Sequence, residues 1–358
     1  MKPARKLLIM AAGTGGHIFP GIAIADLMRQ RGWEVSWLGT QTGMEGQIVP
    51  QHQISMDKLD FSGMRGKGLR HSLSGAWKLL ASFFACRSIL KRRQPDVVLG
   101  MGGYVCVPGG VVSALSGKPV VLMNADAALL LSNRMLQPFA KRILFGLPAT
   151  DMAQNQQMSV IGNPVRPAIC ALPEPVQRYT QRTGRLRILV VGGSLGAQVL
   201  NQTLPAALAL MPAESRPLIV HQSGKQHIAS LRLAYESAGV EAELLDFIED
   251  MPRRYAEADL VICRAGAITV SELTAAGVAS LLVPFMASST SHQAENARWL
   301  AQHQAALHVP QSELTPQRLT EILQKLDRAA CLEMATKAYA LGKRQANQDI
   351  ATLLESLT

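Results

Sequence analysis

Short apolar runs separated by amphipathic stretches follow one another along the first half of the chain. Such runs are typical of strands buried on both faces of a parallel sheet, and the stretches between them are typical of crossover helices. Helices are expected at 23–31, closing on Gly32, and at 73–93, closing before Pro95. The expected strands are LLIM at 7–10, EVSWLG at 34–39, DVVLGMGG at 96–103, PVVLMN at 119–124 and RILFG at 142–146.

The same pattern restarts in the second half. Between the halves, GNPVRPAICALPEP at 162–175 carries four prolines without clear periodicity, which indicates a linker. The stretch 331–357 reads as helix with a break near Gly342. A chain of 358 residues exceeds the usual size of one core, so two α/β domains are predicted. The strands expected in the second domain are RILVVGG at 187–193, PLIVHQSG at 217–224, DLVICRAG at 259–266 and SLLVPF at 280–285.

Composition narrows the class. Hydrophobic residues make up 48% and aromatic residues 5% of the chain, which suits a Val/Leu/Ala-rich α/β interior better than an all-β sandwich. No apolar run reaches the roughly 18 residues that would span a bilayer, and no signal peptide is visible. The five cysteines are scattered and form no CxxC pair, which favours a reducing cytoplasm over a disulfide framework or a zinc site. The net charge of +10 favours an acidic partner, whether nucleotide, lipid headgroup or nucleic acid.

Glycine-rich turns follow the first strand of each half, in LLIMAAGTGGH at 7–17 and RILVVGGSLGA at 187–197. Glycine accepts positive φ and lets the backbone approach a ligand, and the free amides of the next helix attract an anion. GMGGY at 100–104 repeats this device. A nicotinamide cofactor is disfavoured, because no acidic residue ends a strand about 20 residues beyond the second turn. Each turn is typical of a site that binds a phosphate group.

Seven segments in order resemble the MurG family of peptidoglycan glycosyltransferases, which move N-acetylglucosamine from its UDP sugar onto lipid I. The resemblance implies the GT-B fold, two Rossmann-like, doubly wound parallel-sheet domains facing a cleft. It implies a lipid I acceptor and membrane-associating domain at 1–163, a UDP-GlcNAc domain at 164–340, and a C-terminal helix at 341–358 crossing back to the first domain. The segments are AGTGGHIFP at 12–20, VVLGMGGYV at 97–105, GNPVR at 162–166, VVGGSLGAQVLN at 190–201, HQSGK at 221–225, CRAGAITVSE at 263–272 and HQAENA at 292–297.

On the acceptor side, the resemblance makes His17 a candidate base or acceptor contact. An imidazole changes charge near neutral pH and so suits proton transfer. Tyr104 either contacts the acceptor or packs on its own loop. The substrate-binding set implied for this side is Thr14, Gly15, Gly16, Tyr104, Asn124, Asp126 and Asn133.

One departure from the family lies on this side. Family members usually carry a His-Glu-Gln-Asn run where this chain reads Met-Asn-Ala-Asp at 123–126. Asn124 stands at the glutamate position and Asp126 at the asparagine position. We expect the activity to be retained with altered acceptor contacts.

On the donor side, the resemblance assigns Glu272 to the ribose hydroxyls, since one carboxylate can accept two adjacent O–H groups. Arg166 supplies a cation for the uracil or the diphosphate, and Ile248 covers the uracil ring. Gln293 and Asn296 share a helical face and either bond the sugar or form an ordinary polar face. Many members carry an aspartate pair where this chain has Thr290 and Ser291. The residues implied at the diphosphate and sugar are Ser194, Ala267, Ile268, Thr269, Val270 and Ser271.

A mixed basic and apolar stretch at 61–93 either buries its apolar face or docks on an anionic leaflet. The second interpretation predicts a peripheral protein on the cytoplasmic face of the inner membrane. Its basic residues are Arg65, Lys67, Arg70 and 91–93, and its apolar residues include Trp77, Leu80, Phe83 and Phe84.

The resulting hypothesis is an inverting transfer of N-acetylglucosamine to the C4 hydroxyl of the muramoyl sugar of lipid I, with no cofactor and no bound metal. Two alternatives stay open: another GT-B transferase that uses a UDP sugar with a lipid or glycan acceptor, and a non-catalytic nucleotide-sugar-binding protein. Nucleic acid is disfavoured as a partner, because the positive charge is dispersed and lacks an aromatic stacking platform.

Overall fold

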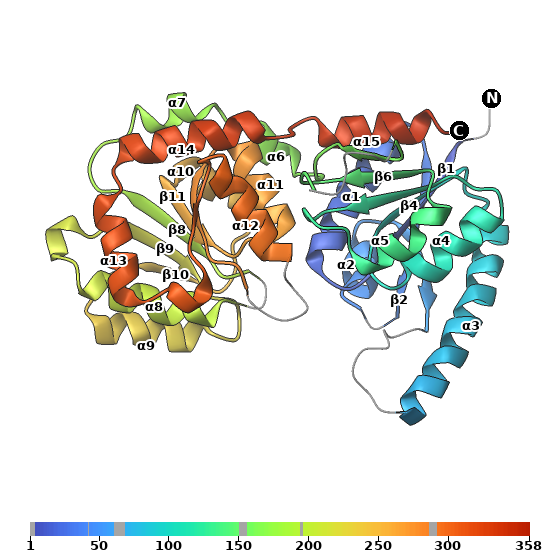
Figure 1. Ribbon diagram of the computed structural model, residues 1–358, viewed down its shortest axis with the longest axis horizontal. Helices are drawn as coiled ribbons and strands as arrows, with labels where there is room; N and C mark the ends of the chain where they lie inside the picture. The colour runs from blue at the N-terminus through green and yellow to red at the C-terminus, as the bar shows by residue number, and fades with distance from the viewer. Residues whose placement is uncertain (1–3, 42, 61–68, 150–155, 194–195, 286–291) are drawn as a thin grey trace. The chain divides into compact units, whose positions relative to one another are not determined.

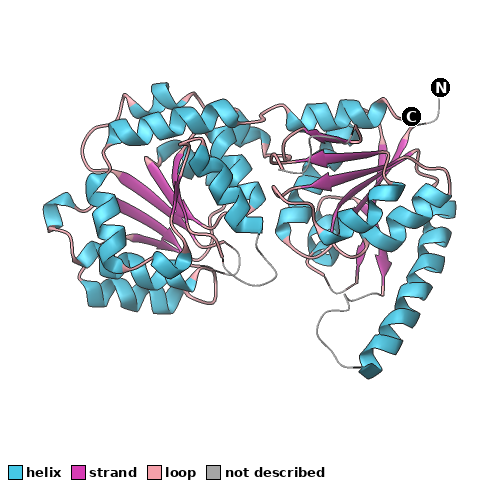
Figure 2. Cartoon of the chain, in the orientation of Figure 1, coloured by secondary structure: helices cyan, strands magenta, loops and turns pink. Residues whose placement is uncertain are grey.

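Two compact units make up the chain, residues 1–165 with 345–358 and residues 166–344. The computed structural model describes residues 4–41, 43–60, 69–149, 156–193, 196–285 and 292–358, with the backbone alone at 69–79 (Figure 1). In each unit the strands form one sheet between helices (Figure 2). The strand pairs of both sheets are parallel, which confirms the predicted α/β class with two parallel-sheet domains.

The sheet of the first unit has the order β3-β2-β1-β4-β5-β6-β7. The chain winds outward from β1 in one direction and then returns to β4 on its other side, so β1 and β4 flank a topological switch point. Ligands of open α/β sheets bind beyond the carboxyl ends of the strands at such a point. The strands are β1 (Lys6–Ala11), β2 (Glu34–Thr40), β3 (Ser55–Leu59), β4 (Val97–Gly102), β5 (Val120–Asn124), β6 (Arg142–Phe145) and β7 (Met158–Val160).

Alternation along β1 builds a core on each face of this sheet. Leu7 and Ile9 join one cluster, which includes Leu354 of the last helix. Leu8 and Met10 join the other. This is the period-two pattern of a strand covered on both faces. The helices of the unit are α1 (Gly15–Gln30), α2 (Glu45–Gln51), α3 (Leu69–Arg93), α4 (Cys106–Leu115), α5 (Leu131–Leu136), η1 (Gln137–Phe139) and α15 (Ala346–Glu355).

The sheet of the second unit has the order β10-β9-β8-β11-β12-β13, so its switch point lies between β8 and β11. Its strands are β8 (Arg187–Val191), β9 (Leu218–Gln222), β10 (Glu243–Leu245), β11 (Leu260–Cys263), β12 (Ala279–Leu282) and β13 (Leu307–His308). Its helices are α6 (Pro167–Cys170), α7 (Pro175–Tyr179), α8 (Gln198–Ala209), η3 (Ala213–Ser215), α9 (Ile228–Ala238), α10 (Met251–Glu257), α11 (Ala267–Ala276), α12 (His292–Gln302), η4 (Gln311–Glu313), α13 (Pro316–Lys325) and α14 (Arg328–Leu341).

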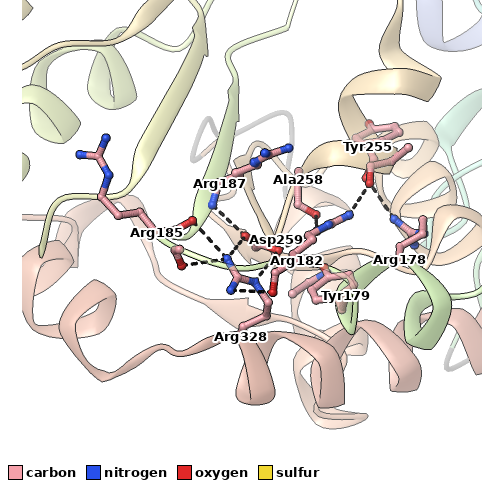
Figure 3. Close-up of polar contacts among 12 residues, drawn as sticks. Arg178, Tyr179, Arg182, Arg185, Arg187, Tyr255, Ala258, Asp259 and Arg328 are labelled. Atoms are coloured by element: carbon pink, nitrogen blue, oxygen red, sulfur yellow. Dashed lines mark hydrogen bonds and ion pairs between the residues drawn. The ribbon is translucent and has the colours of Figure 1, made fainter.

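A buried ion cluster around Asp259 fixes the beginning of β11. Figure 3 shows the guanidinium groups of Arg182 and Arg328 converging on this carboxylate, at 2.6 Å and 3.2 Å, and the backbone N–H of Arg187 donates to it at 2.8 Å. Burial by itself would raise the pKa of Asp259, but the hydrogen bonds from Arg328, Arg182 and Arg187 outweigh it and hold the pKa below its ordinary value. The cluster therefore ties the segment before β8 to the start of α14.

The expected strands are all present, and the break near Gly342 separates α14 from α15. The helix expected at 23–31 begins instead at Gly15 and contains Pro20, because it grows directly out of the glycine turn. The helix expected at 73–93 begins at Leu69. Two short helices, α6 and α7, occupy part of the expected linker.

Candidate functional site

The two glycine turns of the first unit pack against each other at its switch point. The backbone N–H of Ala12 donates to the carbonyl of Gly102 at 3.2 Å. A Cβ on Gly103, whose φ is +90°, would overlap the carbonyl oxygen of Ala12. A Cβ on Gly102 would lie 2.7 Å from the His17 ring. The approach of the turns thus depends on glycine at 102 and 103.

The start of α1 offers backbone donors next to this junction. Its N-cap residue, Thr14, is exposed and makes no side-chain cap, so the first amides of the helix are left for another acceptor. His17 is half-buried, and its Nδ1 lies 3.2 Å from the carbonyl oxygen of Ala12. A carbonyl can only accept, so Nδ1 carries the hydrogen and Nε2 is the unprotonated nitrogen of the neutral ring. This tautomer suits the role of base expected for His17.

Glu45, which was not among the residues predicted from the sequence, accepts hydrogen bonds that orient the first glycine turn. Its carboxylate is fully buried and accepts the backbone N–H of Gly13 at 3.2 Å. It also accepts the backbone N–H and the hydroxyl of Thr40, at 3.0 Å and 2.5 Å. The N–H groups of Ala12 and Gly13 are therefore both bonded within the protein, and the amides at the start of α1 are left for an anion.

Asn124 organises the loop that leads from β5 to α5. It is fully buried, and its amide nitrogen donates to the carbonyls of Asp126 and Ala128. Its oxygen accepts from the backbone of Leu130 and from Asn133. The hydrogen-bonding capacity of this side chain is thus spent within the chain.

The other acceptor-side candidates lie around the same loops. Asn133 is fully buried, donates to Asn124 and to the Met123 carbonyl, and its Oδ1 has no hydrogen-bond partner. Asp126 and Tyr104 are half-buried. The contacts expected of Asn124, Asp126, Asn133 and Tyr104 with a substrate stay predictions.

The glycine turn after β8 repeats the arrangement found after β1. Here Gln222, at the end of the neighbouring β9, accepts the backbone N–H of Gly193 at 3.1 Å and donates to its carbonyl at 3.2 Å. A Cβ on Gly196 would overlap the carbonyl oxygen of Ser223. The turn is therefore packed tightly against the HQSGK segment. Ser194 lies outside the described residues, as do Thr290 and Ser291.

The start of α11 is a second set of uncapped backbone donors. Its N-cap residue is Gly266, which has no side chain to cap the amides of Ala267, Ile268 and Thr269. The segment before it is supported by α12, because the buried Asn296 donates to the Ala265 carbonyl at 3.0 Å.

The remaining donor-side candidates surround this helix start. Gln293 accepts the backbone N–H of Phe285 at 2.8 Å. Val270, Ser271 and Ile248 are buried. The substrate contacts expected of Gln293, Asn296 and these three residues, and of the α11 amides, stay predictions.

Glu272 and Arg166, singled out separately from the sequence, form an ion pair within the second unit. The Nε and Nη2 atoms of Arg166 donate to Oε1 of Glu272 at 3.1 Å and 2.8 Å. The other carboxylate oxygen accepts the hydroxyl of Tyr255 at 3.2 Å. Burial raises the pKa of Glu272, and the charge of Arg166 and the hydrogen bonds from Arg166 and Tyr255 oppose that rise. The arrangement provides a buried carboxylate beside an open helix start.

In the basic and apolar stretch at 61–93, the structure describes side chains from Leu80 onward. Leu80 and Phe84 of α3 are 54% and 75% exposed. Arg92 and Arg93 pair with Asp57, at 2.5 Å and 2.7 Å, so part of the positive charge is already compensated. Arg65 and Lys67 lie outside the described residues, and the side chains of Arg70 and Trp77 are not described.

Two absences concern the described residues. Across the described ranges, no helix is long and apolar enough to cross a membrane. Within the same ranges, His, Cys, Asp and Glu form no group of three or more that could hold a metal ion.

Sequence reasoning missed three residues that shape the site: Glu45, Gln222 and Tyr255. Gln222 lies inside the quoted HQSGK segment, where its position at a strand end was a usable signal. Glu45 and Tyr255 stand in short amphipathic stretches, and nothing local distinguishes them from surface residues.

Comparisons with known proteins cover both units. The chain matches the glycosyltransferase family 28 N-terminal domain over residues 7–145 and the glycosyltransferase family 28 C-terminal domain over residues 187–354. It is 64% identical, over 99% of both chains, to the UDP-N-acetylglucosamine–N-acetylmuramyl-(pentapeptide) pyrophosphoryl-undecaprenol N-acetylglucosamine transferase of Herminiimonas arsenicoxydans. The protein of the same name from Janthinobacterium is 62% identical over 99% of both chains. The crystal structure of Acinetobacter baumannii MurG is similar with a TM-score of 0.85 at 36% identity, covering 98% of this chain and 99% of that one.

Proposed function

The chain belongs to the MurG glycosyltransferases of glycosyltransferase family 28, and from this membership we propose that it transfers N-acetylglucosamine from UDP-N-acetylglucosamine to lipid I. Lipid I is the N-acetylmuramyl-(pentapeptide) pyrophosphoryl-undecaprenol of the relatives' name. The observation that carries the proposal is the 64% identity, over 99% of the chain, to a relative named for this reaction. The protein is thus a hexosyltransferase of peptidoglycan synthesis.

We assign the donor to the second unit. Uncapped amides at the start of α11 favour a diphosphate through hydrogen bonds and the helix dipole. Glu272, in the second turn of the same helix, suits the ribose hydroxyls, because a carboxylate accepts and never donates. Arg166, whose side chain is 45% exposed, can leave Glu272 and meet the charge that develops on UDP.

We assign the acceptor to the glycine turns of the first unit. The diphosphate of lipid I would be received by the amides of Thr14, Gly15 and Gly16, beyond the amide that Glu45 holds. Nε2 of His17 would accept the proton of the C4 hydroxyl as it attacks the anomeric carbon. A single displacement of this kind inverts the configuration there and gives a β-1,4 link.

The test measures UDP release from UDP-N-acetylglucosamine with and without lipid I. We expect release only when lipid I is present, which separates a transferase from a nucleotide-sugar-binding protein. Glu272→Gln should raise KM for the donor about tenfold or more, as loss of a hydrogen bond to a charged group predicts. Glu321→Gln, an exposed site on α13, is the matched control and should leave KM unchanged. Release that ignores lipid I, or that prefers another acceptor in a panel, contradicts the proposal.

We further propose that the protein acts as a peripheral protein on the cytoplasmic face of the inner membrane, and that α3 contacts the anionic leaflet. Two exposed apolar side chains of this helix, Leu80 and Phe84, lie about three and two turns before Lys91, which begins its basic last turn. Leu80→Ser with Phe84→Ser should weaken binding to phosphatidylglycerol vesicles. The control, Leu233→Ser, removes an apolar side chain that is 63% exposed on α9. Equal binding of the α3 variant and the wild type at low and high salt would contradict this assignment.

A further inference from the structure

We propose that Tyr255 is a positioning residue for nucleotide recognition, whose hydroxyl fixes the Glu272 carboxylate in the orientation that receives the ribose of the donor. The inference rests on the proposed function, because it takes Glu272 as the ribose-binding group. Tyr255 lies on α10 and is 1% exposed, and its hydroxyl donates to Oε2 of Glu272 on α11. A fully buried ring has few alternative positions, so this donor is fixed in place.

The number of hydrogen bonds that Glu272 can accept distinguishes the roles of its two partners, Arg166 and Tyr255. A carboxylate offers about four lone-pair positions. Arg166 occupies two of them on Oε1, and Tyr255 occupies one on Oε2. A ribose that places both hydroxyls on Glu272 must therefore displace Arg166, whose side chain is partly exposed, whereas the contact with buried Tyr255 persists. Tyr255 is the partner that orients the carboxylate in both states.

A buried arginine holds the two helices that carry this pair. Arg178 donates to the backbone carbonyl of Tyr255 at 3.1 Å, a contact visible in Figure 3. The same guanidinium donates to the carbonyls of Ala276 and Gly277, where α11 ends. Arg178 thus fixes the spacing between α10 and α11. The distance between the Tyr255 hydroxyl and Glu272 is therefore set by the backbones of the two helices as well as by the two side chains.

Charge gives the proposal a second readout. Among the described residues, the groups that face Glu272 are Arg166 just before α6, Cys170 at its end, Tyr255 on α10 and Cys263 on β11. Burial raises the pKa of both thiols, so these cysteines stay neutral near pH 7. The Tyr255 hydrogen bond favours the charged carboxylate that the ribose requires. Without it, the pKa of Glu272 rises further and nucleotide binding is lost at a higher pH during acidification.

The experiment titrates UDP and 2′-deoxy-UDP into the full chain by calorimetry between about pH 5 and pH 8. For wild type we expect tighter binding of UDP. Tyr255→Phe should reduce the UDP to 2′-deoxy-UDP affinity ratio by about threefold to tenfold, because it removes a hydrogen bond to a charged group, and should move the acidic limb to higher pH.

Tyr235→Phe is the matched control. This tyrosine is also buried in the second unit, and its hydroxyl lies 3.0 Å from Nδ1 of His221. The substitution therefore removes a buried phenol oxygen, as Tyr255→Phe does, but leaves the contacts of Glu272 unchanged. It should leave both the ratio and the acidic limb at their wild-type values. The proposal is overturned if Tyr255→Phe keeps the wild-type affinity ratio and pH profile but Glu272→Gln loses the ratio. If Glu272→Gln also keeps the ratio, the assignment of Glu272 to the ribose is what fails.

Discussion

At the scale of single residues, both glycine turns share one device. In each turn, a side chain from the neighbouring strand or from the helix after it accepts the second N–H beyond the strand end. Glu45 accepts that of Gly13, and Gln222 accepts that of Gly193. The two side chains differ in charge, but each orients the turn by accepting its N–H. In the first unit, the uncapped amides at the start of α1 follow this turn and are left for an anion.

Gly103→Ala should abolish the junction of the turns. The φ of +90° costs an alanine about 1–2 kcal/mol, and its Cβ would also overlap the Ala12 carbonyl. We expect a large loss of transferase activity together with a lower melting temperature. Gly117→Ala, at φ +74° with open space around it, carries the strain alone and should lower stability while activity persists. Equal activities of the two variants would show that the junction does not matter for the reaction.

Asp259→Asn should destabilise the second unit by about 3–5 kcal/mol, because the fully buried carboxylate is the counter-charge of two half-buried arginines. The folded pKa of Asp259 lies below its ordinary value. Its contribution to stability is therefore complete above the unfolded pKa and is lost as pH falls through the folded pKa. Urea unfolding at a series of pH values below about pH 5 should show a smaller further loss for the variant than for wild type. Parallel pH curves would contradict this account.

Residue roles were predictable from the sequence only where a local motif carried them. The glycines stood out because positive φ and close approach demand them, and Glu272 stood out through its resemblance to a family motif. Tyr255 and Glu45 did not stand out, because Glu272 and Gly13, the site residues that they contact, lie 17 and 32 positions away and are brought near by folding. Asn124 was assigned to a substrate by its position, whereas its hydrogen bonds hold its own loop.

At the scale of elements, the strands that the sequence did not predict share one property. They are β3, β7, β10 and β13, and each forms an edge of its sheet. An edge strand is covered less completely, so it needs no continuous apolar run, and these four are mostly half-buried or exposed. Central strands such as β1 and β11 are buried on both faces, so their continuous apolar runs can be recognised in the sequence.

The last helix contributes core residues to the first unit, which makes its stability testable. Leu354→Ala should cost about 2–5 kcal/mol, because Leu354 is fully buried in the cluster that holds Leu7 and Ile9. Thr352→Ala, on the exposed side of α15, is the control and should be close to neutral. Denaturant unfolding of both variants measures the difference. A cost below that of the control would show that α15 is not part of this core.

At the scale of the whole molecule, the two-domain α/β class was predictable because the same strand and helix pattern occurs twice. In each repeat the chain winds outward from its first strand and later returns on that strand's other side, which creates a switch point, and a glycine turn follows the first strand. Sequence position alone does not say which unit the last residues join. That depends on the apolar face of α15 finding a partner surface on α1.

Because residues 345–358 belong with residues 1–165, the chain passes from one unit to the other twice. The two ends of the first unit's polypeptide lie close, since the Arg5 guanidinium donates to the Glu355 carbonyl at 3.4 Å. A circularly permuted gene that encodes 345–358, a short glycine linker and then 1–165 should therefore yield an autonomous, protease-resistant fold. Plain 1–165 should instead expose the apolar surface of α1 and bind the dye ANS. If the plain fragment proved as resistant as the permuted one, the first unit would not need its distant tail, and conventional truncation would suffice to isolate it.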